Sequence, residues 1–335
     1  MAVIKWIGIF VGVLVVALAL WLLSMRLGMW NPSYEEVRQK YAGPPSKFVK
    51  VGDVNLHVRD EGTGPVVLML HSSMSNLSIW DGWADILKKK YRVVRIDWPP
   101  YGLSQDPKPS TGTIGVAKIV ADFVQQQNLT DMTIVGSSSG ATLAVMYTAA
   151  HPERVKALAL STLPLSAPPP TEIPLIDTAI VWTHDNLVPN YNPRFWYKRS
   201  LSLLYGTPSR LKPETVDWYW SMNNIPGKFE RVSTYYKANT GSLWKSGAGD
   251  EAAKIRVPIL LQWGDKDIVL PISRVPDAVA KFSNATVEVI HYPDVGHYPM
   301  IELPEQTGQD LLSFVDRVHA SAPARAGAQA STGAR

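Results

Sequence analysis

Short apolar runs typical of β-strands alternate with helix-like segments along most of the chain. The strand-like runs are Phe48–Val51, Asn55–Arg59, Val66–Leu70, Arg92–Ile96, Met132–Val135, Val155–Leu160, Pro258–Gln262 and Thr286–Ile290. The helix-like segments are Ile79–Lys89, Ile114–Gln127, Ala141–Ala150, Ser273–Phe282 and Pro304–Val318. Because strands that alternate with helices form parallel sheets covered by helices, the pattern predicts an α/β fold with a mostly parallel central sheet flanked by helices.

One long segment interrupts this alternation. Residues 165–254 contain no convincing strand, and they carry five tryptophans: Trp182, Trp196, Trp218, Trp220 and Trp244. We therefore expect a helical insertion into a core made of residues 48–164 and 255–319. The last segment, residues 320–335, is rich in alanine, glycine and serine and lacks apolar periodicity, so we expect it to be disordered.

The N-terminal region has the length and composition of a membrane anchor. Trp6–Met25 is a run of 20 residues without a charge, which makes a helix of about 30 Å and matches the hydrocarbon thickness of a bilayer. We expect residues 1–26 to form a transmembrane anchor and residues 27–47 to form a polar linker. A cleaved signal peptide, whose apolar region is shorter at about 7–15 residues, and a buried helix are the alternatives.

The orientation of this anchor is weakly determined by its flanking charges. Lys5 and the terminal amine precede the apolar run, whereas Arg26, Arg38 and Lys40 follow it. The positive charges on the two sides are nearly balanced, so they barely favour either orientation. We expect the globular part to lie outside the cytoplasm. The lack of cysteine is compatible with that location and does not require it.

Composition narrows the chemistry that the chain can perform. It has no cysteine, which excludes disulfides, a cysteine nucleophile and thiolate metal sites. Its net charge of +4 comes from scattered basic residues, so we expect no nucleic-acid partner. No His-Glu-x-x-His, Walker A or Gly-x-Gly-x-x-Gly pattern occurs, and no metal or organic cofactor is expected. The sequence leaves the oligomeric state open.

A Gly-x-Ser-x-Gly pattern, Gly136–Gly140, joins the predicted strand Met132–Val135 to the helix that begins at Ala141. A serine in a tight strand-to-helix turn needs glycine neighbours for steric reasons, and the turn exposes its hydroxyl next to backbone N–H groups. Only Ser138 has glycine two residues before it and two residues after it. Ser138 is therefore the candidate nucleophile, and a glycine- and serine-rich loop without chemistry is the alternative.

A nucleophilic serine needs a base, and the base needs a residue that orients it. Downstream of Ser138, Asp265 and Asp267 follow one predicted strand and His297 follows the next. The carboxyl ends of parallel strands meet at one sheet edge, so Ser138, Asp267 and His297 reach that edge in the order serine, acid, histidine. Spacing alone does not separate Asp265 from Asp267.

The remaining histidines are weaker candidates. His57, His151 and His319 are expected to be surface or packing residues, and His291 lies beside the last strand. His184 lies in the insertion and could touch substrate, whereas His71 follows a strand and is expected to orient a loop.

Six segments occur in the order seen in one known family. They are Leu70–Ser73, Asp97–Ser104, Val135–Gly140, His151–Val155, Gly264–Pro271 and Gly296–Pro299. On these segments, over residues 48–318, the chain resembles the α/β-hydrolase fold superfamily, in the branch of lidded esterases, lipases and carbon–carbon bond hydrolases. It departs from the family pattern at Ser72 and Pro100, where glycine is usual.

The resemblance implies roles for individual residues. It makes Ser138 the nucleophile and His297 the base, and the pattern Gly-x-x-Asp followed four residues later by proline favours Asp267 over Asp265. The oxyanion hole would use the backbone N–H groups of Ser73 and Ser139, and residues 165–254 would form the lid. Members with an aspartate nucleophile, the haloalkane dehalogenases and epoxide hydrolases, are disfavoured because position 138 is serine.

Together these observations predict a membrane-anchored serine hydrolase acting on a carboxylic ester with an apolar portion. The insertion tryptophans could line an apolar cleft, or they could form the core of the insertion and its seat on the main domain. The same residues would serve hydrolysis of a carbon–carbon, amide or peptide bond, or peracid formation. A ligand-binding protein on a hydrolase scaffold is the non-enzymatic alternative.

Overall fold

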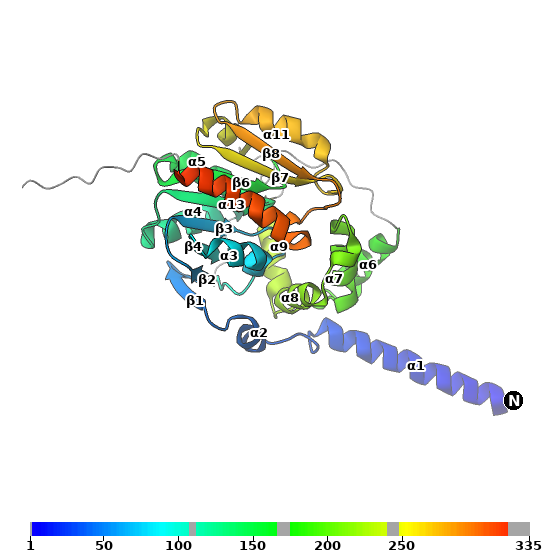
Figure 1. The fold of residues 1–335 in the computed structure, drawn as a ribbon. Coiled ribbons are helices and arrows are strands. Elements are labelled where there is room, and N and C mark those ends of the chain that lie inside the picture. Colours follow the sequence, from blue (N-terminus) through cyan, green and yellow to red (C-terminus); the bar gives the residue numbers. More distant parts are fainter. Residues whose placement is uncertain (1, 107–111, 166–174, 240–247, 321–335) are drawn as a thin grey trace, which may run out of the picture.

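The computed structural model describes residues 2–106, 112–165, 175–239 and 248–320, and its strands form one eight-stranded sheet (Figure 1). The strand order is β1-β2-β4-β3-β5-β6-β7-β8. The strands are β1 Ser46–Val51, β2 Val54–Glu61, β3 Val66–Leu70, β4 Arg92–Ile96, β5 Met132–Ser137, β6 Val155–Ser161, β7 Ile259–Gly264 and β8 Val287–Tyr292. From β4 to β8 along this order neighbouring strands are parallel, whereas β2 pairs antiparallel with both β1 and β4, which confirms the predicted fold class.

Helices cover both faces of the sheet (Figure 1). Alternate residues of β3 enter different cores: Val67 and Met69 pack with α3 Asp81–Leu87 and α13 Pro304–Ala320. Leu68 and Leu70 pack in the other core, which includes residues of α4 Gly112–Gln126, α5 Ser139–Ala150 and α11 Val275–Lys281. Burial on both faces explains why the parallel strands read as continuous apolar runs in the sequence.

The register aligns the ends of the central strands. Leu70 of β3 lies beside Gly136 of β5, which lies beside Leu160 of β6, which in turn lies beside Leu261 of β7. The loops that follow these strands therefore emerge at one sheet edge, where open α/β sheets place their ligands.

The segment between β6 and β7 is helical, and its described part contains no strand. Its main helices are α6 Leu175–Leu187, α7 Arg194–Leu204, α8 Pro213–Asn223 and α9 Lys228–Asn239, followed by the short α10 Ala248–Glu251. Trp218 and Trp220 belong to the hydrophobic cluster that joins α7 and α8 to the main core, whereas Trp182 is exposed. Trp244 lies outside the described residues.

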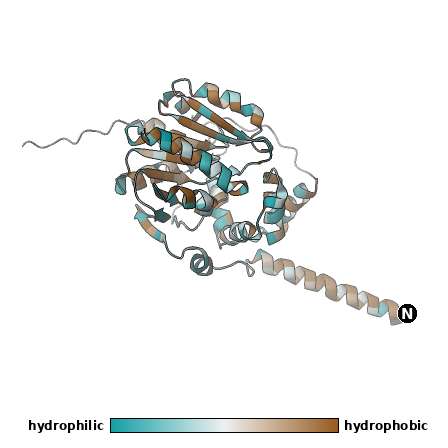
Figure 2. Ribbon diagram, in the orientation of Figure 1, coloured by the Kyte–Doolittle hydropathy of each residue, from teal (hydrophilic) through white to brown (hydrophobic). Residues whose placement is uncertain are grey.

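The N-terminal region contains two helices. Figure 2 shows α1, Ala2–Arg26, as an apolar helix that projects from the rest of the molecule. Within the described residues, Val3–Arg26 is the one segment long and apolar enough to span a membrane. The second helix, α2 Tyr34–Tyr41, lies in the segment expected to be only a linker, because Ser33 and Glu36 form a capping box that starts it.

The other end of the chain is only partly described. Helix α13 continues to Ala320, and the tail expected to be disordered lies, from residue 321 onward, outside the described residues.

Candidate active site

Ser138 lies between the end of β5 and the start of α5 in a strained backbone conformation. Its φ is 52° and its ψ is −121°, a region that residues other than glycine rarely adopt. Its N–H donates to the carbonyl of Ser161 at the end of β6, over 2.9 Å. The turn therefore reverses the chain sharply at this one serine.

The two glycines around Ser138 are required by close contacts. A Cβ on Gly136 would lie 2.5 Å from Cα of Ala141, and a Cβ on Gly140 would lie 2.1 Å from the carbonyl oxygen of Leu70. Backbone atoms occupy both positions, so no side chain could be accommodated without moving the strand. This contact explains why the pattern has glycine on both sides of the serine.

Asp267 and His297 form a buried hydrogen-bonded pair. Oδ2 of Asp267 lies 2.8 Å from Nδ1 of His297, and both side chains are almost fully buried. The other carboxylate oxygen accepts the N–H groups of Val269 and Leu270, at 2.8 and 2.9 Å. A carboxylate accepts hydrogen bonds, so Nδ1 of His297 is the nitrogen that donates to Asp267, and Nε2 is the ring nitrogen that this contact leaves available.

The structure separates the two acids that the spacing alone left open. Asp265 points to a different histidine, with its Oδ1 3.0 Å from Nδ1 of His291, and this contact is on the surface. Asp267 is the acid that contacts His297.

The serine and the histidine loop meet at the end of β6. Thr162 follows Ser161, whose carbonyl accepts from Ser138, and its hydroxyl donates to the carbonyl of His297 at 3.5 Å. Among the described residues no hydrogen bond joins Oγ of Ser138 to His297. Catalytic hydrogen bonds are often long in enzymes without substrate and shorten in the substrate complex.

The two expected oxyanion donors lie next to each other, but one of them is engaged. The N–H of Ser73 donates to the hydroxyl of Ser139 at 2.8 Å, and the two hydroxyl groups are also 2.8 Å apart. Ser139 is the first residue of α5, so its own N–H is one of the unpaired donors of a helix start. No local sequence pattern indicates that the Ser139 hydroxyl accepts the N–H of Ser73.

His71 holds the loop that carries Ser73. Its Nδ1 lies 2.7 Å from the carbonyl of Ser72, its Nε2 accepts the N–H of Trp98, and its own carbonyl accepts from the Trp98 indole. Complete burial lowers the pKa of His71 to about 4, so the ring is neutral at pH 7. His71 therefore orients a loop, as the sequence indicates.

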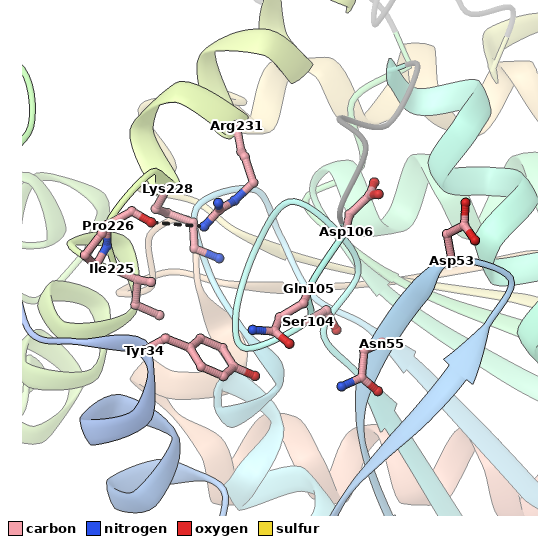
Figure 3. Close-up of a pocket in the computed structure, with 10 residues that line it drawn as sticks. All are labelled: Tyr34, Asp53, Asn55, Ser104, Gln105, Asp106, Ile225, Pro226, Lys228 and Arg231. Carbon is pink, nitrogen blue, oxygen red and sulfur yellow. Dashed lines mark hydrogen bonds between the residues drawn. The ribbon is translucent and has the colours of Figure 1, made fainter.

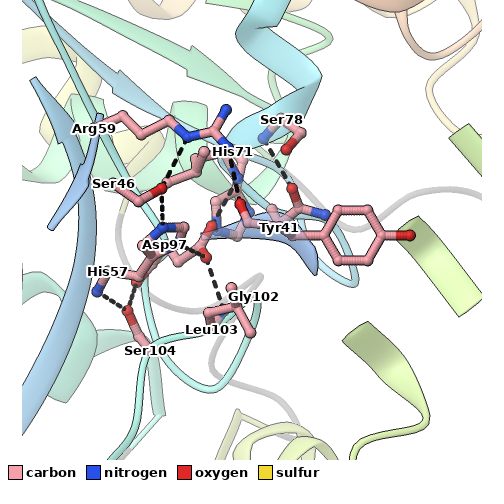
Figure 4. Close-up of polar contacts among 12 residues, drawn as sticks. Tyr41, Ser46, His57, Arg59, His71, Ser78, Asp97, Gly102, Leu103 and Ser104 are labelled. Atoms are coloured by element: carbon pink, nitrogen blue, oxygen red, sulfur yellow. Dashed lines mark hydrogen bonds and ion pairs between the residues drawn. The ribbon is translucent and has the colours of Figure 1, made fainter. Parts of the chain in front are cut away.

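A second buried acid, Asp97, organises the neighbouring loop (Figure 4). Its carboxylate lies 2.7 Å from Nδ1 of His57 and accepts the N–H groups of Leu77 and Leu103, each at 2.7 Å. Burial alone would raise the pKa of Asp97, but His57 and these donors hold it below its usual value. In the sequence, Asp97 stands out only as part of a segment that matches the family. Its position directly after a buried strand is the signal that could have marked it as a functional residue.

A third buried acid, Glu302, was not predicted from the sequence. It ends α12 Pro299–Glu302, and its carboxylate accepts the N–H groups of Gly206, Thr207 and Gly296 at 3.0, 3.0 and 3.2 Å. Arg210 lies 3.3 Å away. Glu302 thus fastens the end of α7 to the loop that carries His297.

The other histidines lie away from Ser138. His151 packs on Tyr147, His319 bonds to Thr133, and His291 pairs with Asp265. His184 packs against Trp196 in the insertion.

A cavity of 480 Å³ lies where α2, β2 and α9 meet, apart from the residues described above (Figure 3). Tyr34, Lys228 and Arg231 are among its lining residues, and neither Ser138 nor His297 is. The Lys228 ammonium donates to the carbonyls of Pro100 and Gly102, at 2.9 and 2.8 Å, and burial lowers its pKa to about 7. Lys228 therefore ties α9 to the loop after β4.

The chain is similar to known proteins in sequence and in fold. A family model described as alpha/beta hydrolase fold matches residues 65–304. The chain is 24% identical over 269 residues to monoacylglycerol lipase ABHD6 of Mus musculus, covering 77% of each chain. It is 26% identical over 276 residues to Lipase 3 of Moraxella sp. (strain TA144), covering 77% of this chain and 79% of that one. A solved structure of a membrane phospholipase A matches with a TM-score of 0.69 at 24% identity, over 94% of this chain and 98% of that one.

Proposed function

Because this chain belongs to the alpha/beta hydrolase fold family and is a hydrolase, we propose that it cleaves a carboxylic ester with an apolar portion through Ser138, His297 and Asp267. The observation that carries the proposal is the buried contact between Asp267 and His297, at 2.8 Å, in a loop that Thr162 joins to the end of β6, where the strained turn of Ser138 is also bound. A strained serine next to an oriented histidine is the arrangement that activates a hydroxyl nucleophile.

In the proposed mechanism, Nε2 of His297 takes the proton of Ser138 as Oγ attacks the ester carbonyl carbon. The N–H of Ser139 holds the resulting oxyanion, joined by the N–H of Ser73 once that group releases the Ser139 hydroxyl. Each such donor contributes on the order of 3 kcal/mol in comparable hydrolases. When the intermediate collapses, the alcohol leaves with the proton from His297 and the acyl group stays on Ser138.

Water completes the cycle. His297 removes a proton from water, which attacks the acyl carbonyl, and the second tetrahedral intermediate expels Ser138 Oγ, which recovers its proton from His297. Asp267 keeps His297 in the required tautomer and stabilises the imidazolium that forms in each half of the reaction.

The apolar substrate is supported by the relatives and by the insertion. Two of the relatives are named lipases. In the insertion, an apolar cavity of 210 Å³ lies open to the surface between α6 and α7, and its lining includes Ile176, Phe195 and Trp196. Because Trp218 and Trp220 pack in the cluster that joins α7 and α8 to the main core, the cavity between α6 and α7 is the better candidate for contact with an apolar chain.

We propose further that α1 anchors the protein in a membrane. The helix has a mean hydropathy of 2.7 over its most apolar stretch, and none of that stretch is buried against the protein. A span of this length matches a bilayer, and it would keep the proposed site close to lipid substrates.

The first test is hydrolysis of p-nitrophenyl esters, from acetyl to dodecanoyl, by the full-length protein in detergent beside Ser138→Ala. Ser46→Ala is a matched control, because Ser46 also contacts a histidine that is paired with an aspartate. We expect activity in the parent and in Ser46→Ala, loss in Ser138→Ala, and an optimum at longer acyl chains.

Two outcomes would contradict the proposal. Equal activity in the parent and in Ser138→Ala would remove Ser138 as nucleophile. No turnover of any ester by the parent, with normal folding by circular dichroism, would exclude an esterase and direct attention to carbon–carbon or peptide bonds.

A further inference from the structure

Helix α6 presents a broad apolar surface that no described residue covers. Leu175, Ile176 and Trp182 are 88%, 59% and 59% exposed, and α6 contains no buried side chain. Phe195, at the start of α7, is 63% exposed on the same part of the insertion. Exposed apolar patches of this kind mark interaction sites.

Both carboxylates of α6 have a partner. The carboxylate of Asp177 is bound by the guanidinium of Arg199 on α7, with one contact at 2.8 Å. Asp185 lies 2.8 Å from the ring of its neighbour His184. The two carboxylates of α6 are therefore bound, whereas its large apolar side chains are exposed to solvent.

The end of α6 is hydrogen-bonded to the end of α1. The guanidinium of Arg26 donates to the carbonyl of Asn186 at 2.9 Å. Just beyond α6, the amide of Asn190 donates to the carbonyl of Arg26 and the amide of Asn31 donates to the carbonyl of Asn190, each at 2.9 Å. Figure 1 shows α6 and α7 beside the end of α1 from which the globular part begins.

From these contacts we infer that the exposed face of α6, together with Phe195, lies in the lipid–water boundary of the bilayer that α1 spans. This inference rests on the proposed anchor. A transmembrane helix brings its last turn to the membrane surface, and the bonds from Arg26 and Asn31 hold α6 at that level. Leucine, isoleucine, phenylalanine and tryptophan are the residues with which interfacial helices enter the headgroup region, to a depth of about 5–10 Å.

The same placement gives the cavity between α6 and α7 access to lipid. Its lining includes Ile176 and Phe195, which are also part of the exposed face. A lipophilic molecule could therefore pass from the bilayer to the insertion without crossing water.

The absence of cysteine from the sequence makes a direct test simple. Single cysteines replace Ile176, Trp182, Leu14 or Ile114, each carries a nitroxide, and the full chain with Ser138→Ala is placed in phosphatidylcholine–phosphatidylglycerol vesicles. Collision with oxygen reports lipid, and collision with a nickel chelate reports water. Leu14 reports on the anchor itself, and Ile114 is a matched apolar control, 72% exposed, on α4.

We expect labels at positions 14, 176 and 182 to favour oxygen, and the label at 114 to favour nickel. If position 14 favours oxygen while 176 and 182 behave like 114, the anchor holds and the inference is wrong. If position 14 favours nickel, the anchor fails and the inference fails with it. Spin–spin broadening at 176 and 182 that disappears on dilution with unlabelled protein would show a second copy covering the face, which also overturns the inference.

A second set of variants tests the contact with α1. In the Trp182→Cys chain, Asn31→Ala with Asn190→Ala removes two of the hydrogen bonds, and we expect the label at 182 to become more accessible to nickel. The matched control is Asn284→Ala, whose amide donates to the carbonyl of Ala253 at 2.7 Å, far along the chain from α1. An unchanged label in the double variant would show that the bonds to α1 do not position α6.

Discussion

Two aspartate–histidine pairs lie buried in this molecule, and they have nearly the same geometry. In one, Asp97 lies 2.7 Å from Nδ1 of His57; in the other, Asp267 lies 2.8 Å from Nδ1 of His297. Each aspartate also accepts two main-chain N–H groups. An oriented histidine therefore does not by itself define an active site.

The pairs differ in the hydrogen-bond partner of Nε2, the ring nitrogen that does not contact the aspartate. Nε2 of His57 contacts the hydroxyl of Ser46 at 2.9 Å, and that hydroxyl also accepts from Arg59 at 3.1 Å (Figure 4). Ser46 lies in the regular strand β1. Nε2 of His297 has no hydrogen-bond partner among the described residues, and the serine of its neighbourhood sits in a strained turn at a helix start. The conformation of the serine, rather than the pairing of the histidine, distinguishes the two places.

The largest expected effect contrasts the two serines. Ser138→Ala should lower kcat/KM by ~10⁵-fold or more, as loss of a nucleophilic serine does in comparable hydrolases, whereas Ser46→Ala should leave it within about twofold. The measurement is steady-state hydrolysis of the best p-nitrophenyl ester. A comparable loss in both variants would mean that the His57 pair is catalytic too.

The next contrast is between the two acids. Asp267→Asn should lower kcat by ~10⁴-fold with little change in melting temperature, because the amide favours the wrong tautomer of His297. Asp97→Asn should instead lower the free energy of unfolding by about 1–3 kcal/mol, since an amide nitrogen cannot accept one of the buried N–H groups that the carboxylate accepts. Kinetics and thermal unfolding of both variants check this, and a stable, inactive Asp97→Asn would reverse the assignment.

A smaller effect concerns the neutral His71 beside the Asp97 network. Its pKa is lowered from 6.5 to about 4 in the folded state. Below pH 6.5 the unfolded chain binds a proton that the folded chain does not, so the stability due to His71 is present above pH 6.5 and is lost as pH falls toward 4. The loss is on the order of 3 kcal/mol.

Urea unfolding in detergent between pH 4 and 7 measures this difference against His71→Gln. The parent should lose more stability than the variant over that range. Parallel curves would show that His71 is not neutral in the fold.

The smallest expected effect concerns the two expected oxyanion donors, Ser73 and Ser139. Ser139→Ala frees the N–H of Ser73 from a hydrogen bond whose net contribution is about 0.5–1.5 kcal/mol, so kcat should rise by about 2- to 10-fold. Single-turnover acylation measures it, with Ser72→Ala as a neighbouring control. A fall in rate would indicate that the Ser139 hydroxyl itself donates to the oxyanion.

All eight strands can be located from the sequence. For the central strands β3, β5, β6 and β7 the reason is burial on both faces, which makes them nearly continuous apolar runs. Helix α2 was not predicted. Its start is marked by a capping box, a pattern that is recognised only when Ser33 and Glu36 are considered together. Sequence reasoning could not choose between Asp265 and Asp267 from spacing, because that choice depends on which histidine each loop meets in space. The roles of Asp97, Glu302 and the Ser139 hydroxyl depend on contacts between segments far apart in the chain, which no local pattern contains.

The Glu302 carboxylate has a kinetic consequence. Because it accepts the N–H groups of Gly206 and Thr207 as well as that of Gly296, it holds the segment after α7 against the His297 loop. Helix α6, which has no buried side chain, is attached less firmly. In the proposed mechanism, a rearrangement of α6 would therefore change how fast a substrate arrives and leaves, and so KM, without changing the distance between His297 and Ser138 or the rate of acyl transfer.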